Sequence, residues 1–295
     1  LAASIREFQP DVITAWGLKA LSAACLAAPK RQAALVVRRP IPSNRRRASL
    51  SRLETWLLRR ADRVLVANDA EALRYEAMGL PSGKLRVVRP GVRLHYEQAD
   101  GSGDPLCKSA TAVEESAPRI VCAGALEPHK GFYEAIWTFD ILHFADRETE
   151  LTIAGEGSER RRLEEFAARA DLRERIHFTG KFTTIEPLLA QAALAWVPSL
   201  SDSGTGVALE AMAAGLPVIA ARWPGLADII VDGETGFLVH PGSKIELAQK
   251  TRLLLDDSAL RRRLGEAGQR RAEELFTHHA FIEAWLHACS ERRAA

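Results

Sequence analysis

Residues 194–221, LAWVPSLSDSGTGVALEAMAAGLPVIAA, change from strand to helix and back to strand. The apolar run at 194–198 has the length of a buried strand, the small-residue run at 206–214 is typical of a packed helix, and 217–221 is apolar again. A strand, a helix and a second strand joined by short loops form the unit from which parallel sheets are built. This stretch therefore predicts an α/β protein with a parallel sheet.

The same alternation continues toward both ends of the chain. Further strands are expected at 11–15, 34–37, 63–67, 85–88, 119–123, 150–154 and 176–179. Further helices are expected near 18–28, 48–61, 69–78, 131–145, 158–172 and 184–192, and the tail from Lys244 to about Arg293 is nearly all helical. The pattern predicts two Rossmann-like, doubly wound domains, of which the first is incomplete.

The periodicity stops between residues 97 and 118, a stretch rich in Gly, Ser and acidic residues that is typical of a linker. We therefore expect a partial first domain at 1–96, a second domain at 119–275 and a final helix at 276–295. Leu1, Ile5 and Phe8 already have helical spacing, so we expect the sequence to begin inside an element and to be an N-terminally truncated fragment.

The composition excludes several classes of protein. With 295 residues, 47% hydrophobic and 26% charged, the chain is typical of a globular protein rather than a disordered one. The longest stretch without a charged residue, 187–201, is shorter than the roughly 20 apolar residues that a membrane span requires. The four cysteines are far apart, so we expect free thiols in a reducing cytoplasm and neither a disulfide framework nor a zinc site.

The charge is distributed unevenly along the chain. Residues 1–105 contain 18 Lys and Arg against 10 Asp and Glu, whereas the remainder contains 22 against 28. Much of the basic excess lies between Arg38 and Arg52. One interpretation is peripheral contact with anionic lipid at the inner membrane face, and the other is a solvated loop followed by a helix start. No aromatic residue interleaves with these arginines, so a nucleic-acid partner is not expected.

Ligands of open parallel sheets bind outside the carboxyl ends of the strands. The segments that follow three expected strands, 124–131, 155–157 and 199–206, are all glycine-containing. The last leads directly into a helix, whose free backbone N–H groups and positive dipole end suit a phosphate. These segments predict an anion-binding edge.

Three side chains at this edge have the chemistry to hold a nucleotide joined to a sugar. Lys130 can neutralise part of a diphosphate charge, and Glu210, expected in the first helical turn, can accept hydrogen bonds from the vicinal hydroxyls of a ribose. Asp202 can do the same for a sugar. The alternative interpretations are a tight turn at Gly204 and Gly206, a Glu that complements its helix dipole, and an ordinary exposed lysine.

A dinucleotide-binding motif is the alternative from another enzyme class. Residues 204–209, GTGVAL, match the first two glycines of the G-x-G-x-x-G fingerprint but not the third. Residues 155–160, GEGSER, also lack the third glycine. An NAD-dependent oxidoreductase is therefore only a remote alternative.

At this point the sequence resembles a known family. Residues 198–239, PSLSDSGTGVALEAMAAGLPVIAARWPGLADIIVDGETGFLV, look like the donor-site signature of the retaining glycosyltransferases of family 4, also called glycosyl transferases group 1. GALEPHKG at 124–131 is similar to the phosphate loop of that family, and 64–92 is similar to the end of its N-terminal domain. The resemblance implies the GT-B fold and transfer of a sugar from a nucleotide-sugar donor to an acceptor hydroxyl with retention of configuration.

The resemblance also implies roles for residues and parts of the chain. The catalytic residues implied are Lys130 on the donor diphosphate, Asp202 on the donor sugar and Glu210 on the ribose, and the other binding residues are Gly124, Ser203, Gly204, Thr205 and Gly206. The first domain would bind the acceptor, a saccharide or lipid-linked saccharide, and residues 276–295 would pack back toward it. The donor is a substrate and no cofactor or dedicated metal is implied. The activity would belong to cell-envelope or polysaccharide biosynthesis.

Several positions differ from the family pattern. Ala125 replaces an arginine of the phosphate loop, Asp202 replaces a Glu, and Trp16 replaces a His near the acceptor. Trp16 either stacks on a sugar ring or belongs to the core, and we favour the core. These differences leave open a second hypothesis, a non-catalytic relative that only binds a sugar nucleotide. We also expect the fragment itself to be inactive.

Overall fold

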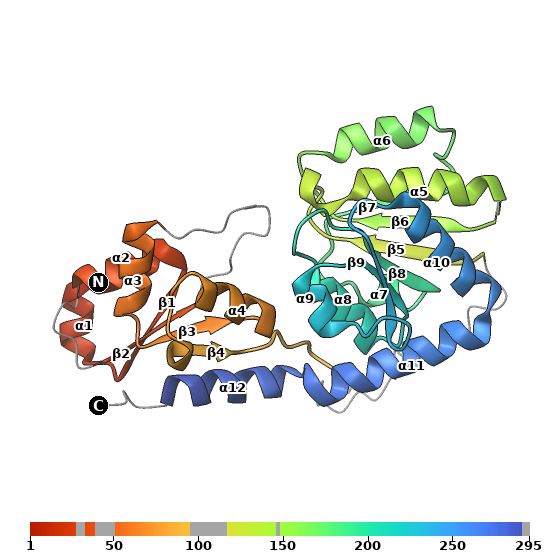
Figure 1. Ribbon diagram of the computed structural model, residues 1–295. Coiled ribbons are helices and arrows are strands. Elements are labelled where there is room, and N and C mark those ends of the chain that lie inside the picture. The colour runs from red at the N-terminus through yellow and green to blue at the C-terminus, as the bar shows by residue number, and fades with distance from the viewer. Residues whose placement is uncertain (28–32, 39–50, 95–116, 146–147, 291–295) are drawn as a thin grey trace, which may run out of the picture. The chain divides into compact units, whose positions relative to one another are not determined.

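The computed structural model describes residues 1–27, 33–38, 51–94, 117–145 and 148–290. These form two compact units, described separately here (Figure 1). Unit 1 consists of Leu1–Pro90 with His279–Ala295, and unit 2 consists of Gly91–His278. Most of the predicted linker lies outside the described residues, as do the arginines at 39 and 45–47.

The described part of unit 1 contains a four-stranded parallel sheet in the order β1-β2-β3-β4. Its strands are β1 (Val12–Trp16), β2 (Ala34–Arg38), β3 (Arg63–Val66) and β4 (Leu85–Val87). Its helices are α1 (Ala2–Phe8), α2 (Gly17–Ala27), α3 (Arg52–Arg60), α4 (Asp69–Ala77) and α12 (His278–Ser290). The register pairs Trp16 with Arg38, so the last residues of β1 and β2 lie side by side.

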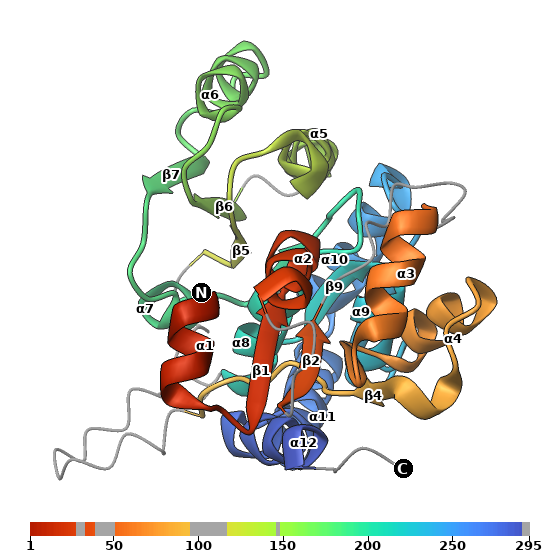
Figure 2. The same cartoon turned by 90° about the vertical axis from the view of Figure 1, so that its left-hand side faces the viewer.

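Both faces of this sheet are covered by helices. Leu35 and Val37 pack in a core with residues of α2, α3 and α4, whereas Val36 and Leu65 pack against α12. Figures 1 and 2 show α2 and α12 on opposite faces of the sheet. Successive strand residues point to opposite faces, and for this reason the strand sequences are continuously apolar rather than alternating.

Two helix starts in unit 1 are defined by side-chain caps. The Ser51 hydroxyl accepts a hydrogen bond from the Glu54 amide at 3.1 Å, and the Glu54 carboxylate accepts one from the Ser51 amide at 2.8 Å. This capping box begins α3, and the Asn68 side chain accepts from the Glu71 amide in the same way at the start of α4. Each cap stabilises its helix by about 1 kcal/mol.

The described part of unit 2 contains a six-stranded parallel sheet in the order β10-β9-β8-β5-β6-β7. Its strands are β5 (Arg119–Ala123), β6 (Glu150–Ala154), β7 (Ile176–Gly180), β8 (Leu194–Val197), β9 (Val218–Ala221) and β10 (Gly236–Val239). Its helices are α5 (Phe132–Ala145), α6 (Arg160–Arg169), α7 (Glu186–Leu189), α8 (Thr205–Ala213), α9 (Pro224–Ile229), α10 (Lys244–Asp256) and α11 (Ser258–Leu275). The chain winds outward in one direction from β5 to β7 and in the other from β8 to β10, which puts the topological switch point between β5 and β8.

The sheet of unit 2 separates two hydrophobic clusters. Ile120, Ile153 and Trp196 pack with α5, α6 and α10 on one face. Val121 and Val197 pack with α7, α8 and α9 on the other. Trp196 is fully buried, and its indole N–H donates to the Thr251 hydroxyl at 2.9 Å, which satisfies the one polar atom of that side chain. Among the described residues, no helix has the length and apolar character needed to cross a bilayer.

Candidate functional site

The loops after β5 and β8 meet at the switch point of unit 2. Gly131 has φ +74°, and a Cβ there would lie 2.1 Å from the Pro198 carbonyl oxygen. The Leu200 amide donates to the His129 carbonyl at 2.8 Å. Only glycine at position 131 permits the loop to approach this closely, because any Cβ there would collide with the Pro198 carbonyl just after β8. The loop that carries Lys130 therefore adjoins the loop that carries Asp202.

The loop after β6 joins the same edge. The Gly124 amide donates to the Ala154 carbonyl at 2.9 Å, and the Leu126 amide donates to the Glu156 carbonyl at 2.8 Å. A Cβ on Gly155 would lie 1.8 Å from the Gly124 oxygen. The three glycine-containing segments singled out in the sequence thus gather at one edge of the sheet, as predicted from the shared carboxyl edge of parallel strands.

Helix α8 begins at this edge, after the loop that follows β8. Gly204 precedes the helix with φ +93°, and a Cβ there would lie 2.5 Å from Val197 Cγ1. No side chain in the described part of the protein caps this helix, and a Cβ on Gly206 would have no neighbouring atom within 4 Å. The first N–H groups of α8, which include those of Thr205 and Gly206, are therefore suited to bind an anion.

Asp202 is held by the start of α9. One of its carboxylate oxygens accepts a hydrogen bond from the Gly225 amide at 3.0 Å, and a side chain at Gly225 would collide with that oxygen. A carboxylate at a helix start is stabilised by the helix dipole. Ser203, the next residue, has its hydroxyl 3.4 Å from that of Ser201. Of the sequence-predicted residues 202–206, the first three form the loop before α8 and the last two begin the helix.

Lys130 ends a short 3₁₀ turn (Pro128–Lys130) after β5. Its side chain is half-buried, and the loss of hydration lowers the pKa of its ammonium group. Ala125, in the same loop, is exposed and brings no charge. Lys130 is thus the only lysine or arginine of the loop at 124–131, and this loop contacts the segment that leads toward α8.

Glu210 lies one turn farther along α8 than the sequence indicated. The helix begins at Thr205, so Glu210 is its sixth residue and falls in the second turn, and the expectation of a first-turn Glu was wrong. The side chain is half-buried. Burial is the larger cause of a raised pKa for its carboxyl, and the negative charge of Glu186 is the second.

Glu186, the first residue of α7, is a site residue that sequence reasoning missed. Its Oε2 atom is buried and has no hydrogen-bond partner among the described residues. The signal that would have found it is positional, because Glu186 follows β7 on the same strand edge as the other loops. It places a second carboxylate close enough to Glu210 to act on it electrostatically.

Trp16 does not belong to the core of unit 1. Its side chain is 62% exposed, so the favoured interpretation was wrong. The ring stacks on Trp285 with centroids 5.2 Å apart and planes 15° apart, and the Arg38 guanidinium carbon lies 5.8 Å from its centroid. Trp16 is the last residue of β1, where its ring lies beside α12 and remains largely exposed.

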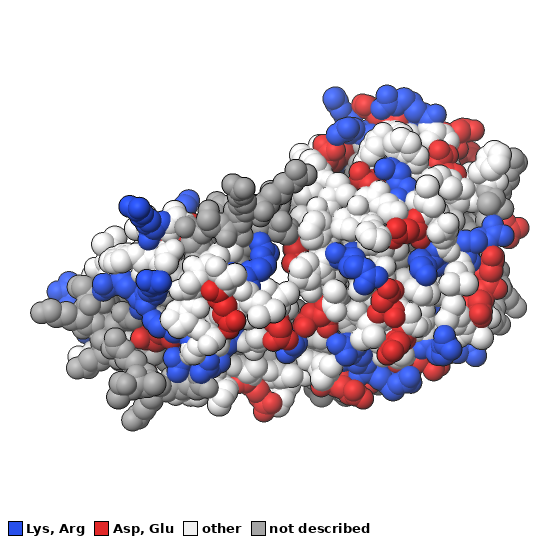
Figure 3. Space-filling view, in the orientation of Figure 1, with Lys and Arg blue, Asp and Glu red and all other residues white. Residues whose placement is uncertain are grey.

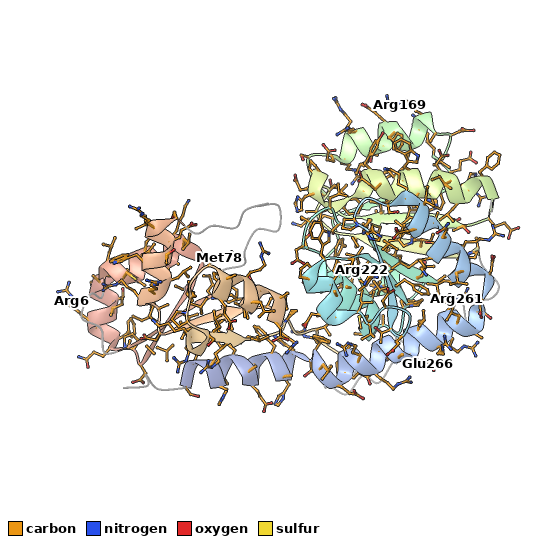
Figure 4. All side chains as sticks on the ribbon, viewed as in Figure 1. Arg6, Met78, Arg169, Arg222, Arg261 and Glu266 are labelled. Atoms are coloured by element: carbon orange, nitrogen blue, oxygen red, sulfur yellow. The ribbon has the colours of Figure 1, made fainter. Side chains whose placement is uncertain are left out.

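Two other groups of charged side chains near these loops are engaged with one another or have the wrong sign for a diphosphate. A surface hollow of about 200 Å³ between α5 and α6 is lined by Glu127, Glu134 and Glu159 against Arg162. Arg222, labelled in Figure 4, follows β9 but pairs with Asp232 and donates to the Leu238 carbonyl at 3.1 Å. Within the described ranges, no group of three or more His, Cys, Asp or Glu is arranged to hold a metal ion.

Comparison with known sequences gives two family matches. Residues 107–271 match the family described as glycosyl transferases group 1, and residues 1–96 match glycosyltransferase family 4. Glycogen synthase of Mycobacterium tuberculosis is 30% identical over 225 residues, which are 74% of this chain and 51% of that protein. The 2-deoxystreptamine glucosyltransferase of Streptomyces kanamyceticus is 30% identical over 240 residues, 80% of this chain and 62% of that one. The chain thus spans about half to three fifths of these relatives.

Comparison with solved structures supports the same architecture. The Anabaena protein Alr3699/HepE, crystallised in complex with UDP, superposes on this chain with a TM-score of 0.84 at 21% identity. The superposition covers 99% of this chain and 82% of the Anabaena chain. At that identity the likeness establishes the fold and leaves the ligand of the present chain open.

Proposed function

The chain belongs to the group 1 glycosyl transferases and has their GT-B fold, and from this premise we propose that the protein transfers a sugar from a nucleotide-sugar donor to an acceptor hydroxyl with retention of configuration. The observation that carries the proposal is the meeting of the Lys130 loop, the 202–206 turn and the uncapped start of α8 at one sheet edge. An uncapped helix start beside a half-buried lysine suits a diphosphate.

In this proposal each side chain acts on a different part of the donor. Breaking the bond between sugar and diphosphate leaves negative charge on the leaving oxygen, which Lys130 and the α8 amides stabilise. Such preorganised donors contribute about 3 to 4 kcal/mol each in enzymes where they have been removed. Asp202, fixed by the Gly225 amide, accepts hydrogen bonds from the donor sugar, and Glu210 accepts them from the ribose.

Gly124 supports the same site through its backbone. It has φ +145° and lies in contact with Gly155 at the end of β6. The absence of a side chain at Gly124 allows a phosphate or sugar to approach the main chain. We include it with Ser203, Gly204, Thr205 and Gly206 among the backbone contacts of the donor.

The acceptor is proposed to be a saccharide or a lipid-linked saccharide. The exposed ring of Trp16, which stacks on Trp285 and has the Arg38 guanidinium carbon 5.8 Å from its centroid, is a flat surface of the kind on which sugar rings stack. Peripheral contact with a membrane through the arginine-rich segment 38–52 belongs to this proposal too. Its residues 39–50 lie outside the described part of the structure.

Turnover with a donor panel tests the activity. The protein is incubated with UDP-, GDP- and ADP-sugars, alone and with mono- and oligosaccharide acceptors, and release of the nucleoside diphosphate is followed. Release that depends on an acceptor, with an α-configured product from an α-configured donor, supports the proposal. Donor binding without release on any acceptor contradicts it.

That second outcome would support the other candidate function, a relative that binds a sugar nucleotide without transferring the sugar. The observation in its favour is Ala125, which is exposed and leaves the phosphate loop with one cation fewer than the family pattern. Restoring the charge with Ala125→Arg separates the two functions, because a gain of turnover shows that the remaining machinery is competent. The oxidoreductase alternative is not retained, since the chain belongs to a transferase family.

A further inference from the structure

The outer side of α3 combines the exposed Arg52 and Arg59 and the half-buried Arg60 with exposed large apolar side chains. We name Arg52, Leu53, Trp56, Arg59 and Arg60 the α3 face. Their spacing puts them on one side of the helix, whereas Leu57 and Leu58 are buried on the other side against the sheet. Leu53 is 64% exposed and Trp56 is 51% exposed. Figure 3 shows blue and white atoms over α3.

The carboxylates close to α3 in the sequence are bound by backbone amides. Glu54 is the only acidic residue within α3, and its carboxylate accepts the hydrogen bond from the Ser51 amide in the capping box. Asp62, just after the helix, accepts a hydrogen bond from the Leu35 amide at 2.7 Å. The five residues of the α3 face are thus three arginines and two apolar residues, and the Arg59 guanidinium also donates to the Gly79 carbonyl at 3.3 Å.

The apolar residues of the α3 face lie among the charges rather than apart from them. The Arg60 guanidinium carbon lies 5.0 Å from the centroid of the Trp56 ring. Indole rings prefer the boundary between lipid headgroups and acyl chains, and guanidinium groups bind phosphate through two parallel hydrogen bonds. A short basic helix with Trp and Leu on its exposed side is the composition of helices that lie in a membrane interface.

We propose that the α3 face docks the protein on an anionic lipid bilayer, with Leu53 and Trp56 in the interfacial region and the arginines on lipid phosphates. A soluble polyanion would be attracted by the same arginines, but it would gain nothing from an exposed leucine. A bilayer uses both kinds of side chain. Because Leu57 and Leu58 anchor α3 to the core of unit 1, the helix is already formed and docking needs no folding step.

This proposal deepens the membrane contact included in the proposed function. Co-sedimentation of the full chain with vesicles tests it and requires no sugar transfer, so its failure is distinguishable from a failure of the proposed transferase activity. Vesicles of phosphatidylcholine alone are compared with vesicles that contain about one third phosphatidylglycerol. We expect binding to the anionic vesicles only, weakened by salt. Replacing Arg52 and Arg59 by Gln should reduce binding about fivefold per charge.

The apolar contribution distinguishes a bilayer from a soluble polyanion. Leu53→Ala should weaken vesicle binding about tenfold. The matched control is Leu73→Ala on α4, since Leu73 is also 64% exposed and lies outside the α3 face. Binding of the Leu73 variant should equal that of the unmodified protein. Heparin binding should respond to the arginine changes and not to Leu53→Ala.

Two results would overturn the proposal. One is vesicle binding that is the same for the unmodified chain, Leu53→Ala and the double arginine variant. The other is a preference for heparin over anionic vesicles, which would assign the face to a soluble polyanion. Fluorescence quenching by brominated lipids gives a second measurement, made on the unmodified protein. If Trp56 enters the interface, these lipids should quench part of the tryptophan fluorescence, and Trp56→Phe should remove that quenched part.

Discussion

The burial of Lys130 affects both the pKa of its ammonium group and its attraction to a diphosphate. It is half-buried, and burial lowers the pKa of its ammonium group. The same partial loss of water strengthens the attraction between that ammonium and a diphosphate, because the local dielectric is lower than in bulk solvent. Since Ala125 adds no charge to the loop, the proposed electrostatic stabilisation from this loop rests on Lys130.

The pH dependence of donor binding should report on Glu210. Only its charged form accepts hydrogen bonds from both ribose hydroxyls, and its pKa is raised by burial first and by Glu186 second. Donor affinity should therefore fall as the pH is lowered, and the fall should begin at a higher pH than for a glutamate with the ordinary pKa of about 4.3. Calorimetric titration of the nucleoside diphosphate across this range measures it.

Glu186→Gln is the variant that tests this cause. Removing the charge of Glu186 should lower the pKa of Glu210 toward its ordinary value, so the loss of affinity should move to lower pH. Glu210→Gln should bind weakly and with little dependence on pH. An unchanged pH profile in Glu186→Gln would show that the two carboxylates do not interact.

Trp16 leads to a prediction about the acceptor. If its exposed ring contacts an acceptor sugar, Trp16→Ala should raise the KM for the acceptor about tenfold, the loss of roughly 1 to 1.5 kcal/mol of ring contact. Donor affinity should stay the same. Trp137→Ala on α5 is the control, because that ring is also exposed. Equal acceptor KM values for both variants and the unmodified protein would exclude Trp16 from the acceptor site.

Sequence reasoning performed unevenly for single residues. It predicted that the glycines and Lys130 would share one edge, because strand ends of a parallel sheet coincide. It misjudged Trp16, since an apolar residue that ends a strand is exposed or buried according to what lies beyond the strand. It overlooked Glu186, whose effect on Glu210 arises only after residues far apart in sequence meet. The roles given to Lys130, Asp202 and Glu210 remain predictions.

Among the elements, the contact between the β5–α5 loop and the end of β8 is the most sensitive to substitution. Gly131→Ala should destabilise unit 2 by about 3 kcal/mol or more, because a Cβ would collide with the Pro198 carbonyl and the positive φ is unfavourable for alanine. Urea denaturation followed by fluorescence of the buried Trp196 measures the change.

Gly206→Ala is the matched comparison for stability. It lies in the first turn of α8, and a Cβ there would meet no atom within 4 Å. Alanine in a helix is more favourable than glycine by up to about 1 kcal/mol. The Gly206 variant should therefore be as stable as the unmodified protein or slightly more so. Similar stability for both glycine variants would contradict the packing of the loops described here.

Element prediction succeeded where a segment rich in apolar and β-branched residues is followed by glycine. The expected strands at 119–123 and 150–154 have the bounds of β5 and β6, and each is followed directly by a glycine. The sequence did not indicate α9 or β10. Helix α9 has six residues and begins at Pro224, and β10 has four residues after a turn. Such short elements owe their existence to packing, which local periodicity does not record.

At the scale of the whole molecule, each unit has its own sheet and its own hydrophobic clusters. The alternation of strands and helices was sufficient to predict the α/β class and two Rossmann-like sheets. The strand order and the switch point between β5 and β8 required the structure, because sequence order does not determine which strands are neighbours. The division of the chain into an acceptor part and a donor part remains a prediction.

The most direct test of the proposed donor site is the affinity of Lys130→Ala for nucleoside diphosphates, measured by calorimetry beside Lys250→Ala. Lys250 lies in the second turn of α10, with its ammonium nitrogen 4.5 Å from the centroid of the Phe237 ring near the start of β10. We expect an affinity loss of roughly 30-fold or more for Lys130→Ala, the value of a charge-assisted contact of about 2 kcal/mol, and none for Lys250→Ala. Equal affinity of the Lys130 variant and the unmodified protein would contradict it.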